Sequence, residues 1–249
     1  MSQPLFDDDT FFSEYKKLRT RSDSFNTLLE QPAFFKMLPP MAGKRVMDLG
    51  CGFGEACREY ERLGAETVTG LDVAEKMLAE ARRLTASSKI QYLAMDLNKL
   101  TGLNGPFDLI TSSLAIHYIF DFSKLIEAVW NRLAEGGYFV FSQEHPLTTA
   151  PMAGPGYCRD PDGRILHYKL ADYGREGSRR IHWFIDKVEK EHRTFSTIIN
   201  VLTQAGFLID QVSEPLPSGR AVKINPELAK EFHKPSFLLI RAYKPKNKG

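Results

Sequence analysis

Short apolar runs alternate with amphipathic segments in the first half of the chain. Five runs have the length and the side-chain types of strands, and they cover residues 45–49, 67–71, 90–95, 107–111 and 137–142. The segments between them repeat apolar residues every three or four positions, which predicts helices at 55–63, 74–84 and 122–133. This alternation is typical of a parallel sheet that carries helices on its faces.

The alternation breaks after residue 143 and returns near the C-terminus. Residues 146–190 are rich in proline, glycine, aromatic residues and paired charges, and they lack the pattern of a core segment. A helix at 192–205 and a strand at 207–212 follow, and a second polar insertion covers 214–235. An apolar strand at 236–243 completes a predicted set of seven strands, five of them parallel.

The first 40 residues form a separate apolar segment with helical spacing, which ends at Pro39 and Pro40. We therefore predict an α/β fold with a doubly wound, seven-stranded, mostly parallel sheet. The N-terminal helices and the two insertions would form a lid over the ligand crevice, beyond the carboxyl ends of the strands. The predicted divisions are 1–43 for the N-terminal lid segment, 44–145 for the first half of the sheet domain, 146–190 for the lid insertion, and 191–249 for the second half, with a small insertion at 214–235.

A glycine-rich turn joins the first predicted strand to the helix behind it. From Asp48 the sequence reads D-L-G-C-G-F-G-E, with Gly50, Gly52 and Gly54 in the turn. Glycine permits positive φ and a close approach of backbone N–H groups to a ligand, and the helix N-terminus favours a carboxylate. The dinucleotide pattern G-x-G-x-x-G fails because Glu55 takes the place of its last glycine. A Walker-type phosphate loop fails because no Gly-Lys-Ser/Thr follows.

Two further aspartates end the second and third predicted strands. Asp72 follows T-G-L, and Asp96 follows A-M. Because the carboxyl ends of parallel strands meet at one edge of the sheet, we expect Asp48, Asp72 and Asp96 on that edge. A carboxylate at Asp72 can accept from both hydroxyls of a ribose. A nicotinamide-dependent enzyme would use an acid in the same place, so Asp72 alone does not distinguish the two classes of enzyme. Capping of backbone N–H groups at strand ends is the structural alternative for each aspartate.

The pattern D-x-G-x-G-x-G at the opening of this sheet resembles motif I of the class I S-adenosylmethionine-dependent methyltransferases, in their small-molecule branch. The resemblance covers residues 44–143 by motif and 192–243 only by the order of helix and strand. It implies a Rossmann-like fold, S-adenosyl-L-methionine as the methyl donor and S-adenosyl-L-homocysteine as the product. Methyl transfer from this donor requires no metal, and the sequence has no H-x-x-H or H-E-x-x-H pattern.

The resemblance also assigns polar contacts to this cofactor. Asp48 would lie near the methionine ammonium group or hold the shape of the loop. Asp72 would bind the ribose, and Asp96 would accept from the adenine amino group. A backbone carbonyl at Ser113 would accept from the ammonium group.

Two apolar residues and the leading helix complete the predicted cofactor site. Val73 and Leu97 would form walls around the adenine, or else belong to the core at the start of helices. Tyr15 and Arg19 would lie near the cofactor carboxylate, with Arg21 as another candidate for the basic residue. A solvated basic face of the helix is the alternative.

Two histidines are candidate general bases. Methyl transfer from a sulfonium requires alignment, exclusion of water, and removal of a proton where the acceptor carries one. His117 follows the fourth predicted strand and His145 follows the fifth, and imidazole titrates near neutrality. In the alternative, each histidine only satisfies backbone groups at a strand end.

Aromatic and charged side chains around the lid are candidate contacts to the methyl acceptor. They would bind an aromatic or anionic compound by stacking and charge-assisted hydrogen bonds, or else close a small lid core. The predicted contacts are Tyr118, Glu144, Tyr173, Trp183 and Arg193. We therefore predict methyl transfer to O, N or C of a small metabolite that is aromatic or carries a carboxylate.

Composition narrows the partners further. The 249 residues include 33 basic and 31 acidic ones, a net charge of +2, which argues against nucleic acid or a membrane surface as the partner. No signal peptide and no apolar run of about 18 residues is present, so we expect a cytoplasmic protein. The alternatives are an RNA or other nucleic-acid methyltransferase, and an S-adenosylmethionine-binding protein without catalysis. The sequence makes no prediction of oligomeric state.

Overall fold

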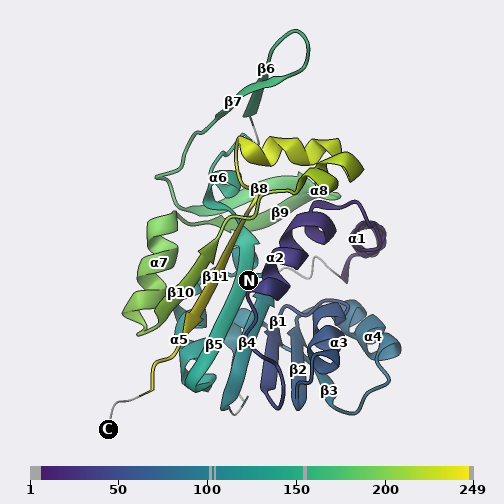
Figure 1. Ribbon diagram of the computed structural model, residues 1–249, viewed down its shortest axis with the longest axis vertical. Coiled ribbons are helices and arrows are strands. Elements are labelled where there is room, and N and C mark those ends of the chain that lie inside the picture. Colours follow the sequence, from purple (N-terminus) through teal and green to yellow (C-terminus); the bar gives the residue numbers. More distant parts are fainter. Residues whose placement is uncertain (1–6, 101–102, 104, 154–155, 247–249) are drawn as a thin grey trace.

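A seven-stranded sheet forms the centre of the protein (Figure 1). The computed structural model describes residues 7–100, 103, 105–153 and 156–246. Across the sheet the strand order is β10-β11-β5-β4-β1-β2-β3. The strands are β1 (Arg45–Leu49), β2 (Thr67–Asp72), β3 (Ile90–Ala94), β4 (Phe107–Ser113), β5 (Leu133–Glu144), β10 (Leu208–Ser213) and β11 (Phe237–Tyr243). All seven predicted strands are therefore present in the described residues, and only β5 begins clearly earlier than expected.

The pairing of the strands confirms the predicted fold class. β1 lies between β2 and β4 and pairs in parallel with both, and β3 and β5 extend the parallel region on either side. β11 is antiparallel to its two neighbours, β5 and β10. The mostly parallel, Rossmann-like sheet brings the carboxyl ends of β1 to β5 to one edge.

Side chains of the strands alternate between two apolar cores. Met47 and Leu49 belong to one core, and Val46 belongs to the other. α5 (Phe122–Arg132) and α7 (Phe195–Gln204) close the first core. The second core is closed by α2 (Gln31–Lys36), α3 (Glu55–Arg62) and α4 (Glu75–Leu84). Coverage of both faces explains why the strands are apolar along nearly their whole length.

Capping side chains set the starts of two of these helices. Asp121 accepts from the backbone N–H of Lys124 at 2.9 Å and caps α5, which begins at residue 122 as predicted. The helix predicted at 192–205 is present as α7, but it begins later than predicted, at Phe195 after its cap Thr194. The preceding strand β9 (Ile185–His192) takes up the first predicted helical residue.

Segments from four parts of the sequence gather beyond the carboxyl edge of the sheet (Figure 1), and we call them the roof. The roof consists of α1 (Asp9–Arg19), η2 (Asn26–Glu30), η4 (Ile116–Tyr118), α6 (Pro146–Thr149), β8 (Gly177–Trp183) with β9, α8 (Gly219–Ile224) and η5 (Pro226–Phe232). Phe11 of α1 packs on Val188 and Trp183 of the β8–β9 hairpin. The side-chain amide of Asn225 donates to the backbone carbonyl of Asp23 at 2.9 Å, which joins the second insertion to the N-terminal segment.

The first insertion contains strands that the sequence pattern did not indicate. It forms two antiparallel hairpins, β6 (Gly156–Arg159) with β7 (Ile165–Lys169) and β8 with β9. In β8 and β9, charged residues occupy neighbouring positions and therefore both faces, so the period-two apolar signal is lost. The predicted division at residue 190 falls inside β9.

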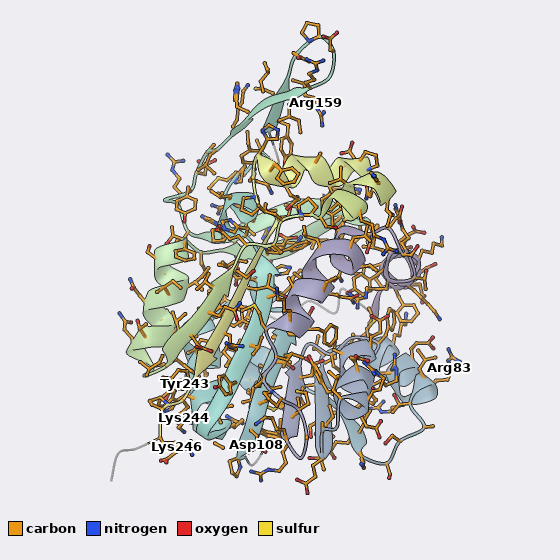
Figure 2. All side chains as sticks on the ribbon, viewed as in Figure 1. Arg83, Asp108, Arg159, Tyr243, Lys244 and Lys246 are labelled. Atoms are coloured by element: carbon orange, nitrogen blue, oxygen red, sulfur yellow. The ribbon has the colours of Figure 1, made fainter. Side chains whose placement is uncertain are left out.

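The β6–β7 hairpin stands away from the body of the protein (Figure 1). In Figure 2, Arg159 of this hairpin and Asp108 near the start of β4 mark opposite ends of the molecule. The short η3 (Leu97–Lys99) follows β3. None of the helices in the described residues is long and apolar enough to cross a membrane.

Candidate active site

The turn after β1 has the backbone conformation that its glycines predict. Gly52 has φ of 52° and Gly54 has φ of 69°, both in the left-handed region. A Cβ on Gly54 would collide with the hydroxyl of Tyr92, so the backbone passes close to β3 here. A Cβ on Gly52 would meet no atom within 4 Å. The turn therefore faces open space at Gly52 and is tightly packed at Gly54.

Asp72 holds the turn from the end of β2. It accepts from the backbone N–H of Gly52 at 2.8 Å and from that of Ala74 at 3.0 Å. Burial raises the pKa of Asp72, and the two N–H donors oppose this rise. The carboxylate thus organises the turn and also lies at the edge where the sequence placed it.

Asp48 lies beneath the turn. It is 2% exposed and accepts from the hydroxyl of Thr111 on β4 at 2.8 Å. Burial raises the pKa of Asp48 to about 6. This contact joins the end of β1 to β4.

A cavity of about 350 Å³ opens beside the turn, and we call it the aspartate cavity. It contains eight of the predicted cofactor contacts, which are Tyr15, Gly50, Gly52, Asp72, Val73, Asp96, Leu97 and Ser113. Asp96 accepts from the backbone N–H and the side-chain amide of Asn98, each at 3.0 Å. Met77 adds a further apolar wall. Two carboxylates and an apolar wall therefore share one space.

A second cavity of about 420 Å³, the glycine-turn cavity, lies on the other side of the turn. Arg19 and Asp48 line it together with Tyr15, Gly50 and Ser113. Arg19 of α1 forms an ion pair with Glu55 at the start of α3. The N-terminal helix α1 thus contacts the glycine turn. Its sequence pattern indicated this position only weakly.

The sequence analysis did not identify Glu30, a fully buried acid behind the glycine-turn cavity. Its Oε1 accepts from the hydroxyls of Ser113 at 2.9 Å and Ser142 at 2.5 Å. Burial raises the pKa of Glu30, and these hydrogen bonds and Arg19 oppose the rise. The sequence signal for Glu30 was an acidic residue inside an otherwise apolar helical segment. Such a residue requires hydrogen-bond partners when it is buried.

Comparison with known proteins decides the family. The model of a family described as a methyltransferase domain matches residues 47–141. A solved S-adenosylmethionine-dependent methyltransferase from Mesorhizobium loti is 44% identical to this chain, with a TM-score of 0.81. The match covers 86% of this chain and 97% of that protein. The chain belongs to the class I S-adenosylmethionine-dependent methyltransferases.

Two curated methyltransferases match a shorter stretch. The malonyl-[acyl-carrier protein] O-methyltransferase of Enterobacter lignolyticus is 34% identical over 44% of this chain and 43% of its own length. The trans-aconitate 2-methyltransferase of Deinococcus radiodurans is 32% identical over 41% of this chain and 38% of its own length. The similarity thus spans less than half of each of these two relatives.

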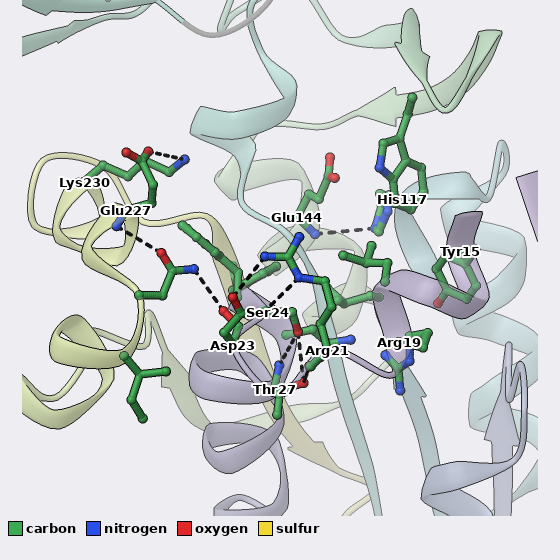
Figure 3. A pocket seen from close by; sticks show the side chains of 18 of the residues that line it. Tyr15, Arg19, Arg21, Asp23, Ser24, Thr27, His117, Glu144, Glu227 and Lys230 are labelled. Carbon is green, nitrogen blue, oxygen red and sulfur yellow. Dashed lines mark hydrogen bonds and ion pairs between the residues drawn. The ribbon is translucent and has the colours of Figure 1, made fainter. Parts of the chain in front are cut away.

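The methyltransferase has a third and larger cavity beneath the roof, of about 610 Å³, which we call the histidine cavity (Figure 3). Four of the residues predicted for catalysis or acceptor binding line it: His117, Tyr118, Glu144 and Trp183. Arg19, Arg21 and Lys230 supply cationic groups, and Phe25 and Phe237 supply apolar wall. Tyr15 lines this cavity and both of the others.

A lysine balances the negative charge of Glu144 in the wall of the histidine cavity. Oε1 of Glu144 lies 2.5 Å from Nζ of Lys190, a residue that the sequence analysis did not single out. The ammonium group of Lys190 also lies 4.8 Å from the ring centroid of Trp183 and 5.9 Å from that of Tyr118. The pair occupies the junction of β5, η4 and the β8–β9 hairpin.

His145 lies outside all three cavities of this methyltransferase. Its Nδ1 accepts from the backbone N–H of Leu147 at 3.1 Å, which caps α6. Its Nε2 lies 2.8 Å from Oε1 of Glu214. Burial lowers the pKa of His145, although Glu214 opposes the shift. Both ring nitrogens therefore have partners in the fold, which is the structural alternative for this histidine.

Tyr173 and Arg193 also lie outside the three cavities. The hydroxyl of Tyr173 accepts from the backbone N–H of Phe195 at 3.0 Å. Arg193 donates to the backbone carbonyls of Ile119 and Phe120, and burial lowers its pKa to about 10. Tyr173 thus contacts the start of α7, and Arg193 contacts the segment that follows η4. Among the described residues, no group of three or more His, Cys, Asp or Glu side chains could hold a metal ion.

Proposed function

We propose that this methyltransferase transfers the methyl group of S-adenosylmethionine to a small metabolite that carries a carboxylate or an aromatic ring. The observation that carries the proposal is the meeting of the three cavities at Tyr15. A donor that fills the two cavities beside the glycine turn would present its reactive end to the histidine cavity. The acceptor would then lie beneath the roof, in line with the donor.

The residues of the two cavities beside the turn fit the methyl donor. Gly52 leaves open space for a ligand against the turn, and Asp72 and Asp96 offer carboxylates to hydroxyl and amino groups. Arg19 is placed to bind a carboxylate in the glycine-turn cavity. When it is bound there, S-adenosylmethionine supplies an electrophilic methyl group on its sulfonium.

The walls of the histidine cavity and the names of two relatives support a small acidic acceptor. Arg21, Lys230 and Trp183 offer charge-assisted bonds and stacking. The two curated relatives act, by their names, on trans-aconitate and on a malonyl group. We propose an acceptor of the same chemical kind for this enzyme, and not a nucleic acid.

Calorimetric titration with S-adenosylhomocysteine tests the donor site. Asp72→Ala should weaken binding by about 1–3 kcal/mol, because it leaves ligand hydroxyls and turn N–H groups without an acceptor. Asp108→Ala is the matched control, since Asp108 accepts from Arg45 at the other end of the sheet. Equal affinities of both variants and the wild type would refute the assignment. Binding of a nicotinamide dinucleotide in place of S-adenosylhomocysteine would refute the proposed function.

A further inference from the structure

His117 presents one polar edge to the histidine cavity. The ring is 3% exposed and lies in η4, directly after β4. Its Nδ1 accepts from the backbone N–H of Glu144 at 3.4 Å (Figure 3). Within the described residues, no group hydrogen-bonds to Nε2. The nitrogen that remains for a ligand is therefore Nε2.

The contact at Nδ1 also determines which nitrogen carries the hydrogen. A neutral imidazole has one donor nitrogen and one acceptor nitrogen, so an accepting Nδ1 leaves the hydrogen on Nε2. Burial lowers the pKa of His117 to about 3, Lys190 and Arg193 act in the same direction, and Glu144 opposes them. Tyr118 packs on the ring at a centroid distance of 4.4 Å. The neutral ring offers the cavity an N–H group and no lone pair.

Glu144 is the acid nearest to this histidine, and it is a poor proton acceptor. It holds the ammonium group of Lys190 at 2.5 Å. Burial acts to raise the pKa of Glu144, but the ammonium groups of Lys190 and Lys234 lower it. A carboxylate that is stabilised as an ion has little tendency to take a proton from a substrate. The wall around His117 therefore supplies a donor and no free base.

The histidine cavity also contains a cation with a replaceable partner. Arg21 extends into the cavity and pairs with Asp23 at 2.9 Å (Figure 3). The side chains of Arg21 and Asp23 are 57% and 43% exposed. Exposed ion pairs contribute little stability, so the carboxylate of a ligand can take the place of Asp23. The cavity thus has an N–H donor at its buried end and a guanidinium nearer the solvent.

We propose that His117 donates its Nε2–H to the oxygen that receives the methyl group, and that this oxygen belongs to a carboxylate that is ionised before it binds. This inference rests on the proposed function. A carboxyl group has a pKa of about 4, so no proton remains to be removed near neutral pH. A lone pair of the oxygen forms the new O–CH3 bond, and the electron pair of the broken C–S bond stays on sulfur. The product is a methyl ester, and no proton is released.

Nitrogen-15 NMR of the ring tests the state of His117 without any turnover. Long-range proton–nitrogen spectra of the full chain with S-adenosylhomocysteine should show hydrogen on Nε2 alone, unchanged from pH 5 to pH 8. A hydrogen on Nδ1, or a titration of the ring within this range, would overturn the proposal. His233→Phe removes an exposed histidine signal and helps to assign the spectrum.

An acceptor panel tests the substrate class. Small di- and tricarboxylates, their amides, phenols and primary amines would each be incubated with S-adenosylmethionine, and the release of S-adenosylhomocysteine measured. We expect turnover with carboxylates alone, at a rate that is flat between pH 6 and pH 9. Turnover of phenols or amines but of no carboxylate, or a rate that follows an enzyme pKa near 6.5, would overturn the proposal. Calorimetric binding of S-adenosylhomocysteine that persists in that case would leave the proposed function intact.

Variants of His117 test the role of its N–H group on the accepted carboxylate. His117→Phe keeps a ring but removes the donor, and should lower kcat/KM about 10- to 100-fold, mainly through KM. His117→Gln places an amide N–H at a similar reach and should restore most of this loss. S-adenosylhomocysteine affinity should stay within about twofold in both variants. Equal activity of His117→Phe and the His233→Phe control would refute the assigned contact.

Discussion

Neighbouring residues of the glycine turn have different tasks. Gly52 faces open space that a ligand can fill, whereas Gly54 packs against Tyr92. Both have positive φ, so a side chain at either position strains the backbone. The turn is therefore a binding surface at one glycine and a packing contact at the other.

Alanine substitutions should separate these two tasks. Gly52→Ala should cost only the strain of the left-handed backbone, about 1–2 kcal/mol of unfolding free energy, but weaken S-adenosylhomocysteine binding at least tenfold. Gly54→Ala should cost about 1–3 kcal/mol more than this, because its Cβ collides with Tyr92. Urea denaturation and calorimetry measure the two effects. Unchanged ligand affinity in Gly52→Ala would show that the open space at Gly52 is not the ligand site.

At the residue scale, the sequence predicts positions whose requirement is local. Gly52 and Asp72 follow from strand–turn–helix geometry, and the structure places both beside the aspartate cavity. The environment of a lid residue depends on partners far along the chain, such as Glu214 for His145. No local pattern distinguishes that histidine from His117, which lies inside a cavity. This is why the residues around the glycine turn were easier to predict than those of the histidine cavity.

α1 is the element that connects the roof to the glycine turn. Tyr15 packs on Phe53 of the turn at a centroid distance of 6.0 Å and on Trp183 of the β8–β9 hairpin at 6.1 Å. Arg19, one turn later, pairs with Glu55. A ligand carboxylate in the glycine-turn cavity would compete with Glu55 for this guanidinium.

Substitutions in this ion pair should have opposite effects. Arg19→Gln should weaken S-adenosylmethionine binding by about 1.5–3 kcal/mol, the typical contribution of a hydrogen bond to a charged group. Glu55→Gln should leave affinity equal or higher, because it removes the competing carboxylate. Lys16→Gln is the control on the same helix, since Lys16 pairs with Glu80 of α4. A loss of affinity in Glu55→Gln as large as in Arg19→Gln would contradict competition at this site.

At the element scale, the central strands could be predicted and the roof hairpins could not. Strands with both faces covered are apolar throughout, which the sequence shows directly. β8 and β9 expose charged side chains such as Arg180 and Glu189, which pair across the hairpin at 2.8 Å. Their stability depends on the pairing of the two strands and on packing against α1, so the local sequence carries little signal.

The whole molecule consists of a rigid sheet and a roof built from distant segments. In the proposed function, the donor site lies at the edge of the sheet, and the roof supplies most of the wall of the acceptor cavity. Because Tyr15 lines all three cavities described above, binding at the proposed donor site should influence the roof as well.

Hydrogen exchange should detect this coupling. S-adenosylhomocysteine should slow amide exchange in α1 and in the glycine turn, because a ligand between them opposes local opening. The β6–β7 hairpin lines none of the three cavities and serves as an internal control. Protection of the turn with no change in α1 would show that the roof does not sense the donor.

The contact between Asn225 and Asp23 has a consequence for biosynthesis. Synthesis proceeds from the N-terminus, so the residues of β1 to β5 and of the glycine turn leave the ribosome before residue 225 does. Such a nascent chain would already hold the parts of the donor site but would lack one wall of the acceptor chamber. The enzyme would thus gain selectivity for its acceptor only after residue 225 is made.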